Sequence, residues 1–135
     1  MHDNSIERYL YTNTMPREII RSFENRQRFL EALKENPGLI IIKFGAEWCG
    51  PCKQIEGFIH EKYSSLPENV QPVIIDVDDS IDVYAFLKAK KIVPHIPTLL
   101  CYVKGNDHYT PDEVVFGANE AHVGDFFDRC MELLD

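Results

Sequence analysis

The feature that most constrains this chain is a pair of cysteines placed directly after a buried-strand pattern. The run Leu39–Phe44 is almost continuously apolar, which is typical of a strand whose sheet is covered on both faces. Cys49-Gly50-Pro51-Cys52 follows and opens a helical pattern that continues to about Tyr63. Pro51 suits a first helical turn, because its missing N–H would have no intrahelical partner there. We therefore expect the two cysteines where the chain leaves a sheet and enters a helix.

Further apolar runs predict the rest of the sheet. Val73–Val77 and Thr98–Val103 indicate two more central strands, Glu113–Phe116 a return strand after a turn, and residues 18–20 a short edge strand. Helical patterns lie between them: one capped by Ser22 and ending near Asn36, one capped by Asp79 or Ser80 and ending near Lys90, and a last one capped by Asn119. Strands that alternate with helices predict one three-layer α/β domain with a mixed sheet over residues 18–135. Residues 1–17 lack periodicity and are predicted to be an N-terminal extension, partly disordered.

Charge and apolar content exclude several classes of function. The net charge of −8 argues against nucleic acid or an anionic membrane as a partner, and no apolar run approaches the roughly 20 residues of a membrane span. The first fifteen residues lack the order of a secretory signal, so we expect a cytoplasmic protein. In that compartment a Cys-x-x-Cys pair is catalytic or metal-binding more often than it is a structural disulfide.

The position of the two cysteines predicts different roles for them. Cys49 should lie near the unpaired N–H groups and the positive end of the helix dipole, where cysteine pKa values fall to roughly 3.5–7.5. Cys49 would be the more exposed sulfur and attack a substrate disulfide, and the shielded Cys52 would resolve the mixed intermediate. Trp48 is either a core residue or, together with Pro51, part of an apolar rim around the site; its place beside a loop cysteine favours the rim.

Two signatures in the chain resemble the thioredoxin family. Phe44–Lys53, with the sequence FGAEWCGPCK, is nearly identical to the active-site segment of thioredoxins, and Val93–Thr98, VPHIPT, resembles the loop that carries their cis-proline. Gly117 matches the glycine that lines the substrate groove. The similarity covers about residues 18–135 and implies the thioredoxin fold, a three-layer α/β/α arrangement around a mixed sheet of four to five strands.

The resemblance also implies an activity, which is protein-disulfide reduction through a reversible Cys49–Cys52 disulfide. Pro97 should follow a cis peptide bond that turns the backbone of Ile96 toward the sulfurs as an edge for a substrate peptide. Trp48, Gly50, Pro51, Ile96 and Gly117 are the substrate-binding residues expected on this basis. Disulfide-containing proteins would be the substrates, and a reductase or another dithiol would be the electron donor. The protein would need no bound cofactor and would be a monomer.

Lys43 departs from the family pattern. Thioredoxins have a buried aspartate at this position, six residues before the first cysteine, and the lysine that partners it aligns with Ile74 here. One interpretation is that the Lys43 stem lies along the sheet and its ammonium reaches solvent or a carboxylate. The other is that the cation lies under Cys52, favours its thiolate and makes the pair more oxidising than in a typical thioredoxin. Glu56, one helical turn after Cys52, is then a candidate proton carrier.

Alternatives remain for the other cysteines, for His95 and for the function as a whole. Cys101 and Cys130 fit apolar core patterns, and the alternative is a second redox site or a dimer disulfide. His95 could reach the site and tune Cys49, or remain a solvated loop residue. A zinc site needs four ligands and one Cys-x-x-Cys supplies two, so no metal is expected. The remaining alternative to an enzyme is a redox-regulated adaptor that uses the fold as a docking surface.

Overall fold

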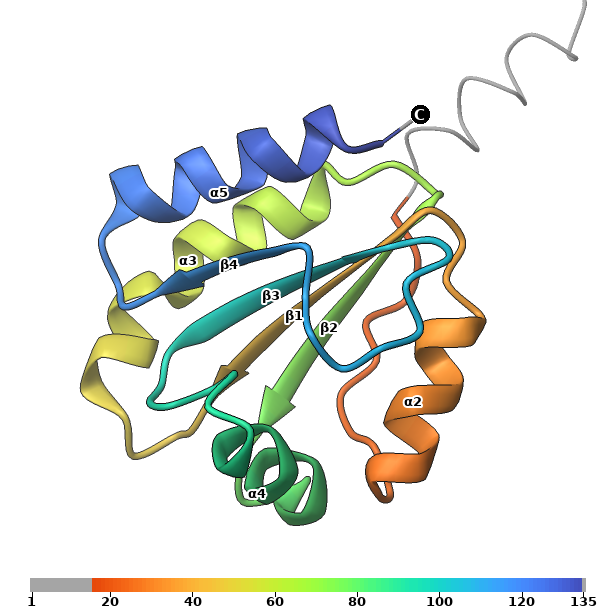
Figure 1. Cartoon of the computed structure of the whole chain (residues 1–135). Coiled ribbons are helices and arrows are strands. Elements are labelled where there is room, and N and C mark those ends of the chain that lie inside the picture. Colours follow the sequence, from red (N-terminus) through yellow and green to blue (C-terminus); the bar gives the residue numbers. More distant parts are fainter. Residues whose placement is uncertain (1–15, 135) are drawn as a thin grey trace, which may run out of the picture.

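A four-stranded mixed sheet forms the centre of the molecule (Figure 1). The computed structural model describes residues 16–134, so most of the predicted 1–17 extension lies outside the described residues. The strands lie in the order β2-β1-β3-β4, with β1 parallel to β2 and antiparallel to β3, and β3 antiparallel to β4. Their bounds are β1 Leu39–Gly45, β2 Val70–Asp76, β3 Thr98–Val103 and β4 Glu113–Phe116. The mixed sheet predicted from the sequence is confirmed.

Helices cover both faces of this sheet. They are α2 (Arg26–Lys34), α3 (Gly50–Ser64), α4 (Ile81–Ala89) and α5 (Glu120–Glu132). Figure 1 shows α3 and α5 on one face and α2 and α4 on the other. None of these helices in the described part of the chain is long and apolar enough to cross a membrane.

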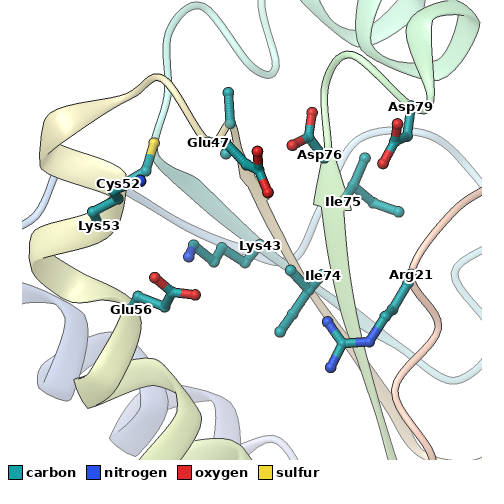
Figure 2. Close-up of a pocket in the computed structure, with 12 residues that line it drawn as sticks. Arg21, Lys43, Glu47, Cys52, Lys53, Glu56, Ile74, Ile75, Asp76 and Asp79 are labelled. Carbon is teal, nitrogen blue, oxygen red and sulfur yellow. The ribbon is translucent and has the colours of Figure 1, made fainter.

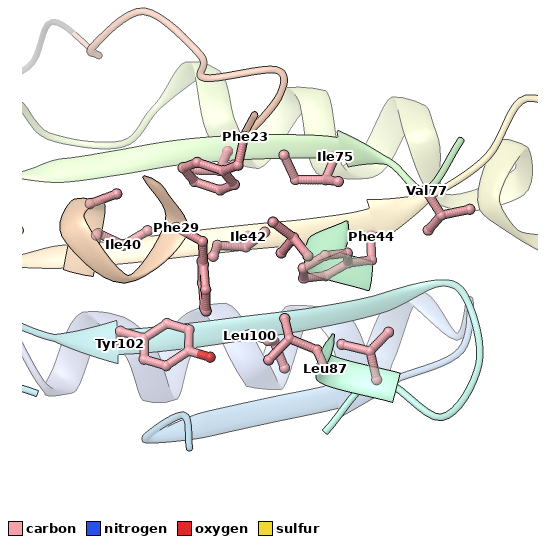
Figure 3. Packing of buried hydrophobic residues seen from close by; sticks show 14 of the residues in the cluster. Phe23, Phe29, Ile40, Ile42, Phe44, Ile75, Val77, Leu87, Leu100 and Tyr102 are labelled. Carbon is pink, nitrogen blue, oxygen red and sulfur yellow. The ribbon is translucent and has the colours of Figure 1, made fainter. Parts of the chain in front are cut away.

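Two clusters of apolar side chains fill the space between the layers. Because side chains alternate along a strand, Ile40, Ile42 and Phe44 of β1 point toward α2 and α4. Figure 3 shows these three residues with Phe29 of α2 and other members of this cluster. Leu39 and Ile41 belong to the cluster on the α3 and α5 face. Lys43 continues that second row, so the register of β1 points its side chain toward α3.

The first predicted helix begins later and ends earlier than the sequence pattern indicates. Asn25, not Ser22, is the N-cap of α2, and its side chain accepts a hydrogen bond from the Arg28 amide. The chain before it is held away from helical geometry, since the Phe23 amide donates to the Ser80 hydroxyl 3.1 Å away. Asn36, predicted as the helix end, lies beyond α2.

The strand β2 begins three residues before its predicted start because a proline is tolerated inside it. The Pro72 carbonyl accepts from the Ile20 amide (3.2 Å), and the Ile20 carbonyl accepts from the Ile74 amide (2.9 Å). Proline fits a strand where its missing N–H does not interrupt a central ladder, as near a sheet edge. The edge strand predicted at residues 18–20 is reduced to this single bridge at Ile20.

Candidate active site

The two cysteines of the Cys-x-x-Cys motif lie at the N-terminus of α3, as predicted. Cys49 is the N-cap, its sulfur accepts a hydrogen bond from the Cys52 amide (3.3 Å), and Pro51 occupies the first turn. Cys49 and Cys52 are joined by a disulfide, with 5.3 Å between their Cα atoms. The motif therefore brings both sulfurs together on one turn of backbone without any distant element.

The surroundings of the pair differ on its two sides. Cys49 is 6% exposed and Cys52 is 2% exposed, so Cys49 is the more accessible residue, as expected, although both are largely covered. Gly50 and Pro51 are exposed beside them. Trp48 is 69% exposed, and its indole nitrogen donates to the Asp78 carboxylate at 2.8 Å. Trp48 is thus a rim residue held in place by the loop after β2, and not a core residue.

The loop before β3 lies against the sulfur of Cys49, the more accessible of the two cysteines. The Ile96–Pro97 peptide bond is cis, as the resemblance implied, and the Ile96 carbonyl oxygen lies 4.0 Å from Cys49 Sγ. The Gly117 amide donates to the Pro97 carbonyl at 2.9 Å, with Gly117 at a φ of +86° that favours glycine. Cys49, Ile96, Pro97 and Gly117 are therefore brought together, as the resemblance implied.

An aromatic pair beside this loop was not predicted. The rings of His95 and Phe116 lie 5.3 Å apart between centroids, and both residues are exposed. Phe116 pairs with Thr98 and directly precedes Gly117, so it flanks the same loop. No hydrogen bond or ion pair joins His95 to Cys49 within residues 16–134. The signal that could have indicated Phe116 is a large apolar residue at the end of a short edge strand, next to the groove glycine.

Lys43 lies behind the disulfide, in the wall of a cavity of about 350 Å³ (Figure 2). We call this space the Lys43 cavity; its lining includes Lys43, Gly45, Cys52, Glu56, Ile74 and Asp76. Lys43 is 6% exposed and pairs in the sheet with Ile74, the predicted position of the missing partner. A Cβ placed on Gly45 would lie 3.4 Å from Cys52 Sγ and 3.5 Å from Lys43 Cε, so the two side chains converge on Gly45.

The electrostatics of Lys43 are those of a buried cation without a direct partner. It makes no hydrogen bond or ion pair with any other residue in the described part of the chain. Burial lowers the pKa of Lys43, and the Glu56 carboxylate opposes this by raising it. Figure 2 shows the amine end of Lys43 between Cys52 and Glu56. The Lys43 side chain thus points into the space between the sheet and α3, and its effect on the redox pair stays a prediction.

Cys101 and Cys130 lie in the core between the sheet and α5. Both are free and fully buried, so neither offers the exposed thiol that an intermolecular disulfide needs. A hydrogen bond with the Cys130 thiol and burial raise the pKa of Cys101. Within residues 16–134, no group of three or more histidine, cysteine or acidic side chains is arranged to hold a metal ion.

Comparison with known proteins agrees with the geometry of this site. The family model described as Thioredoxin matches residues 21–128. Thioredoxin from Equus caballus is 38% identical over 91 residues, which is 64% of this chain and 79% of that protein. The solved thioredoxin of Fasciola hepatica is 26% identical at a TM-score of 0.65, covering 82% of this chain and 98% of its own. The solved thioredoxin of Trichomonas vaginalis has the same fold, with a TM-score of 0.67 at 22% identity and coverage of 82% and 96%. This chain belongs to the thioredoxin family, and with its Cys49–Cys52 pair it is a thiol–disulfide oxidoreductase.

Proposed function

We propose that the protein reduces disulfides in partner proteins, with Cys49 as the attacking thiolate and Cys52 as the resolving thiol. The observation that carries this assignment is the placing of Cys49 as the N-cap of α3, with its sulfur accepting from a backbone amide. Helix N-terminal N–H groups favour negative charge, and a thiolate is the nucleophile in disulfide exchange. Cys49 also has the greater exposure of the two, so a partner disulfide reaches it first.

The reaction proceeds through two exchanges. The Cys49 thiolate attacks one sulfur of the partner disulfide, forming a mixed disulfide and releasing the other partner sulfur as a thiolate. Cys52 then attacks Cys49 Sγ, which closes the Cys49–Cys52 disulfide and releases the second partner thiolate. Two electrons have passed to the partner protein, and an external reductase or dithiol must return two electrons to this pair.

The partner peptide binds across the loop that faces Cys49. The Ile96 backbone, 4.0 Å from Cys49 Sγ, provides the polar edge for an extended peptide, and Pro97 holds that edge in its cis geometry. Exposed Trp48, Gly50 and Pro51 form one side of the groove. Gly117 lies on the other side, together with the His95–Phe116 pair.

Lys43 raises the reduction potential of the Cys49–Cys52 pair, so that its disulfide is a stronger oxidant. A positive charge near Cys52 favours its thiolate and so stabilises the reduced form, which makes the disulfide more oxidising by roughly 30 mV for each 1.4 kcal/mol. The position of Lys43 in the same cavity as Cys52 supports this effect. A glutathione redox titration of wild type, Lys43→Met and Lys43→Asp should place wild type as the most oxidising of the three. Equal midpoint potentials would remove Lys43 from this role.

The protein works as a monomer in a reducing compartment, the cytoplasm, with a reductase or another dithiol as its donor. The two free and buried thiols, Cys101 and Cys130, are compatible with such a compartment. Light scattering in solution measures the oligomeric state, and fractionation of the source cells measures the location.

Insulin reduction in the presence of dithiothreitol tests the assignment of the two cysteines. Cys49→Ser should abolish the protein-dependent rate, whereas Cys52→Ser should still form a mixed disulfide that mass spectrometry detects. Cys130→Ala is the matched control and should keep the rate, because its sulfur is buried on the α5 side. A wild-type rate no higher than that of Cys49→Ser would instead favour the adaptor alternative.

A further inference from the structure

We propose that Lys43 accepts the proton of Cys52 when Cys52 attacks the mixed disulfide, an inference that rests on the proposed function of the pair. The resolving step needs such an acceptor, because the thiolate and not the thiol is the nucleophile. A buried thiol such as Cys52, 2% exposed, has little direct access to solvent. The proton must therefore leave through a neighbouring group or through water in the Lys43 cavity.

Lys43 is the buried member of the three basic side chains that line the cavity, and it lies beside that path. Its Cε and Cys52 Sγ approach the same point above Gly45, at 3.5 and 3.4 Å. Its amine end points toward α3, between Cys52 and Glu56 (Figure 2). A volume of about 350 Å³ is large enough for several water molecules, each of which occupies about 30 Å³ in the liquid. A proton can thus pass from Cys52 to Lys43 through one water, within the reach expected of a general base.

The other charged groups of the cavity lie farther out. They are Arg21 before α2, Glu47 before the cysteine motif, Lys53 and Glu56 on α3, Asp76 at the end of β2 and Asp79 after it. All of these are exposed except Asp76, which is half-buried, whereas Lys43 is 6% exposed and has no direct ion-pair partner in the described part of the chain. Burial lowers the pKa of Lys43 and so favours the neutral amine that a proton acceptor requires. Glu56 opposes this shift and, being exposed, can pass the proton on to solvent.

The step balances in atoms and charge. The Cys52 thiol gives its proton to the neutral Lys43 amine, its sulfur attacks Cys49 Sγ, and the bond between Cys49 and the partner sulfur breaks. The products are the Cys49–Cys52 disulfide, a Lys43 ammonium and a partner thiolate. In the reverse direction the ammonium donates its proton to Cys52 as that sulfur leaves. Because the acceptor is an amine, the proton transfer produces two opposite charges, ammonium and thiolate, that attract each other.

Single-turnover kinetics with dithiobis(nitrobenzoate) separate this step from the first attack. Reduced protein mixed with excess reagent should release one thionitrobenzoate when Cys49 attacks and a second when Cys52 resolves. Lys43→Met and Lys43→Arg should slow the second release at least about tenfold at pH 9, where more of the Lys43 amine is neutral than at pH 7, since a general base contributes roughly 10²–10⁴-fold. Both should leave the first release within about twofold of wild type. Lys53→Met is the control and should change neither release.

Lys43→Arg distinguishes proton transfer from charge alone. Arginine keeps the positive charge and cannot be deprotonated in a protein, so it preserves the electrostatic effect on the redox potential but cannot accept the proton. A second release in Lys43→Arg as fast as in wild type would overturn the proton-acceptor role. If wild type itself gave no first release, the proposed attack by Cys49 would be refuted instead. For wild type alone, slowing of the second release by about twofold or more in D₂O is expected, and an unchanged rate would overturn the proposal without any variant.

Discussion

Tyr63 is expected to fasten the active-site helix to the sheet, and Tyr63→Phe measures how strongly. Tyr63 lies near the end of α3, is 2% exposed, and its ring packs edge-on against Phe127 at 6.0 Å between centroids. Its hydroxyl lies 3.1 Å from the Ile41 carbonyl oxygen of β1 and 3.0 Å from the Val73 carbonyl oxygen of β2. Phenylalanine keeps the ring contact and removes only the hydroxyl, so the change reports on these polar contacts.

The expected loss in free energy of unfolding is about 1 kcal/mol. One hydroxyl proton can serve one carbonyl at a time, so the two short distances amount to a single net hydrogen bond, worth about 0.5–1.5 kcal/mol. Ile41 and Val73 lie in strands that pair with each other, so we expect their carbonyl oxygens to keep backbone hydrogen bonds when the Tyr63 hydroxyl is removed. For a domain of this size, a loss of about 1 kcal/mol corresponds to a fall in Tm of roughly 3–6 °C.

Urea unfolding of the oxidised protein, followed by circular dichroism, measures this loss. Tyr84→Phe is the matched control, because Tyr84 is half-buried and its hydroxyl has no hydrogen-bond partner within residues 16–134; its change should stay within about 0.5 kcal/mol. A loss for Tyr63→Phe below about 0.3 or above about 3 kcal/mol would refute the single-hydrogen-bond interpretation.

The same variant has a predictable pH dependence. Burial raises the pKa of Tyr63 above its ordinary value of 10.0. Above pH 10 the unfolded chain therefore binds fewer protons than the folded protein, and the free energy of unfolding falls as pH rises. Phenylalanine has no such contribution, so the gap between wild type and Tyr63→Phe should be constant from pH 7 to 9 and should narrow above pH 10. A gap that widens above pH 10 would contradict the sign of the shift.

Four further substitutions test other parts of the structure. Gly38→Ala should destabilise the folded protein by about 2 kcal/mol or more, because the new Cβ would lie 2.5 Å from the Asn69 carbonyl oxygen. In Gly57→Ala the new Cβ meets nothing within 4 Å, so this change should stabilise the folded protein by up to about 1 kcal/mol. Equal urea midpoints for the two variants would contradict this reasoning. Lys43→Met should stabilise the oxidised form by about 1 kcal/mol at pH 7 by removing a buried charge. Since burial lowers the pKa of Lys43, the unfolded chain binds more protons below pH 10.5, so wild-type stability should rise with pH and this advantage should shrink by pH 10; an advantage that grows would refute it. Cys130→Ala should cost about 1–2 kcal/mol in urea unfolding and leave insulin reduction unchanged, and a lost rate would show a redox role for that thiol.

The elements that the sequence predicted best depend on contacts within a few residues. The bounds of Thr98–Val103 and Glu113–Phe116 follow from short apolar runs beside a turn, and Asn119 caps α5 through an amide three residues later. Ser22 failed as a cap for the opposite reason: Ser80, far along the chain, accepts from the amide of the residue after Ser22. Local patterns cannot indicate that contact, because it exists only once the segment before α2 lies beside the start of α4.

The same division holds for the active site. By itself the sequence determined the redox pair, since Cys49, Pro51 and Cys52 carry their own geometry within one helical turn. Only the tertiary structure decided that Trp48 bonds to Asp78, and that Lys43 is buried beside Cys52 without a direct counter-ion in the described part of the chain. These facts depend on the register of β1 against β2 and on the packing of α3 over them. Register and packing come from contacts between distant segments, and a linear pattern of residue types does not specify which side chains then meet.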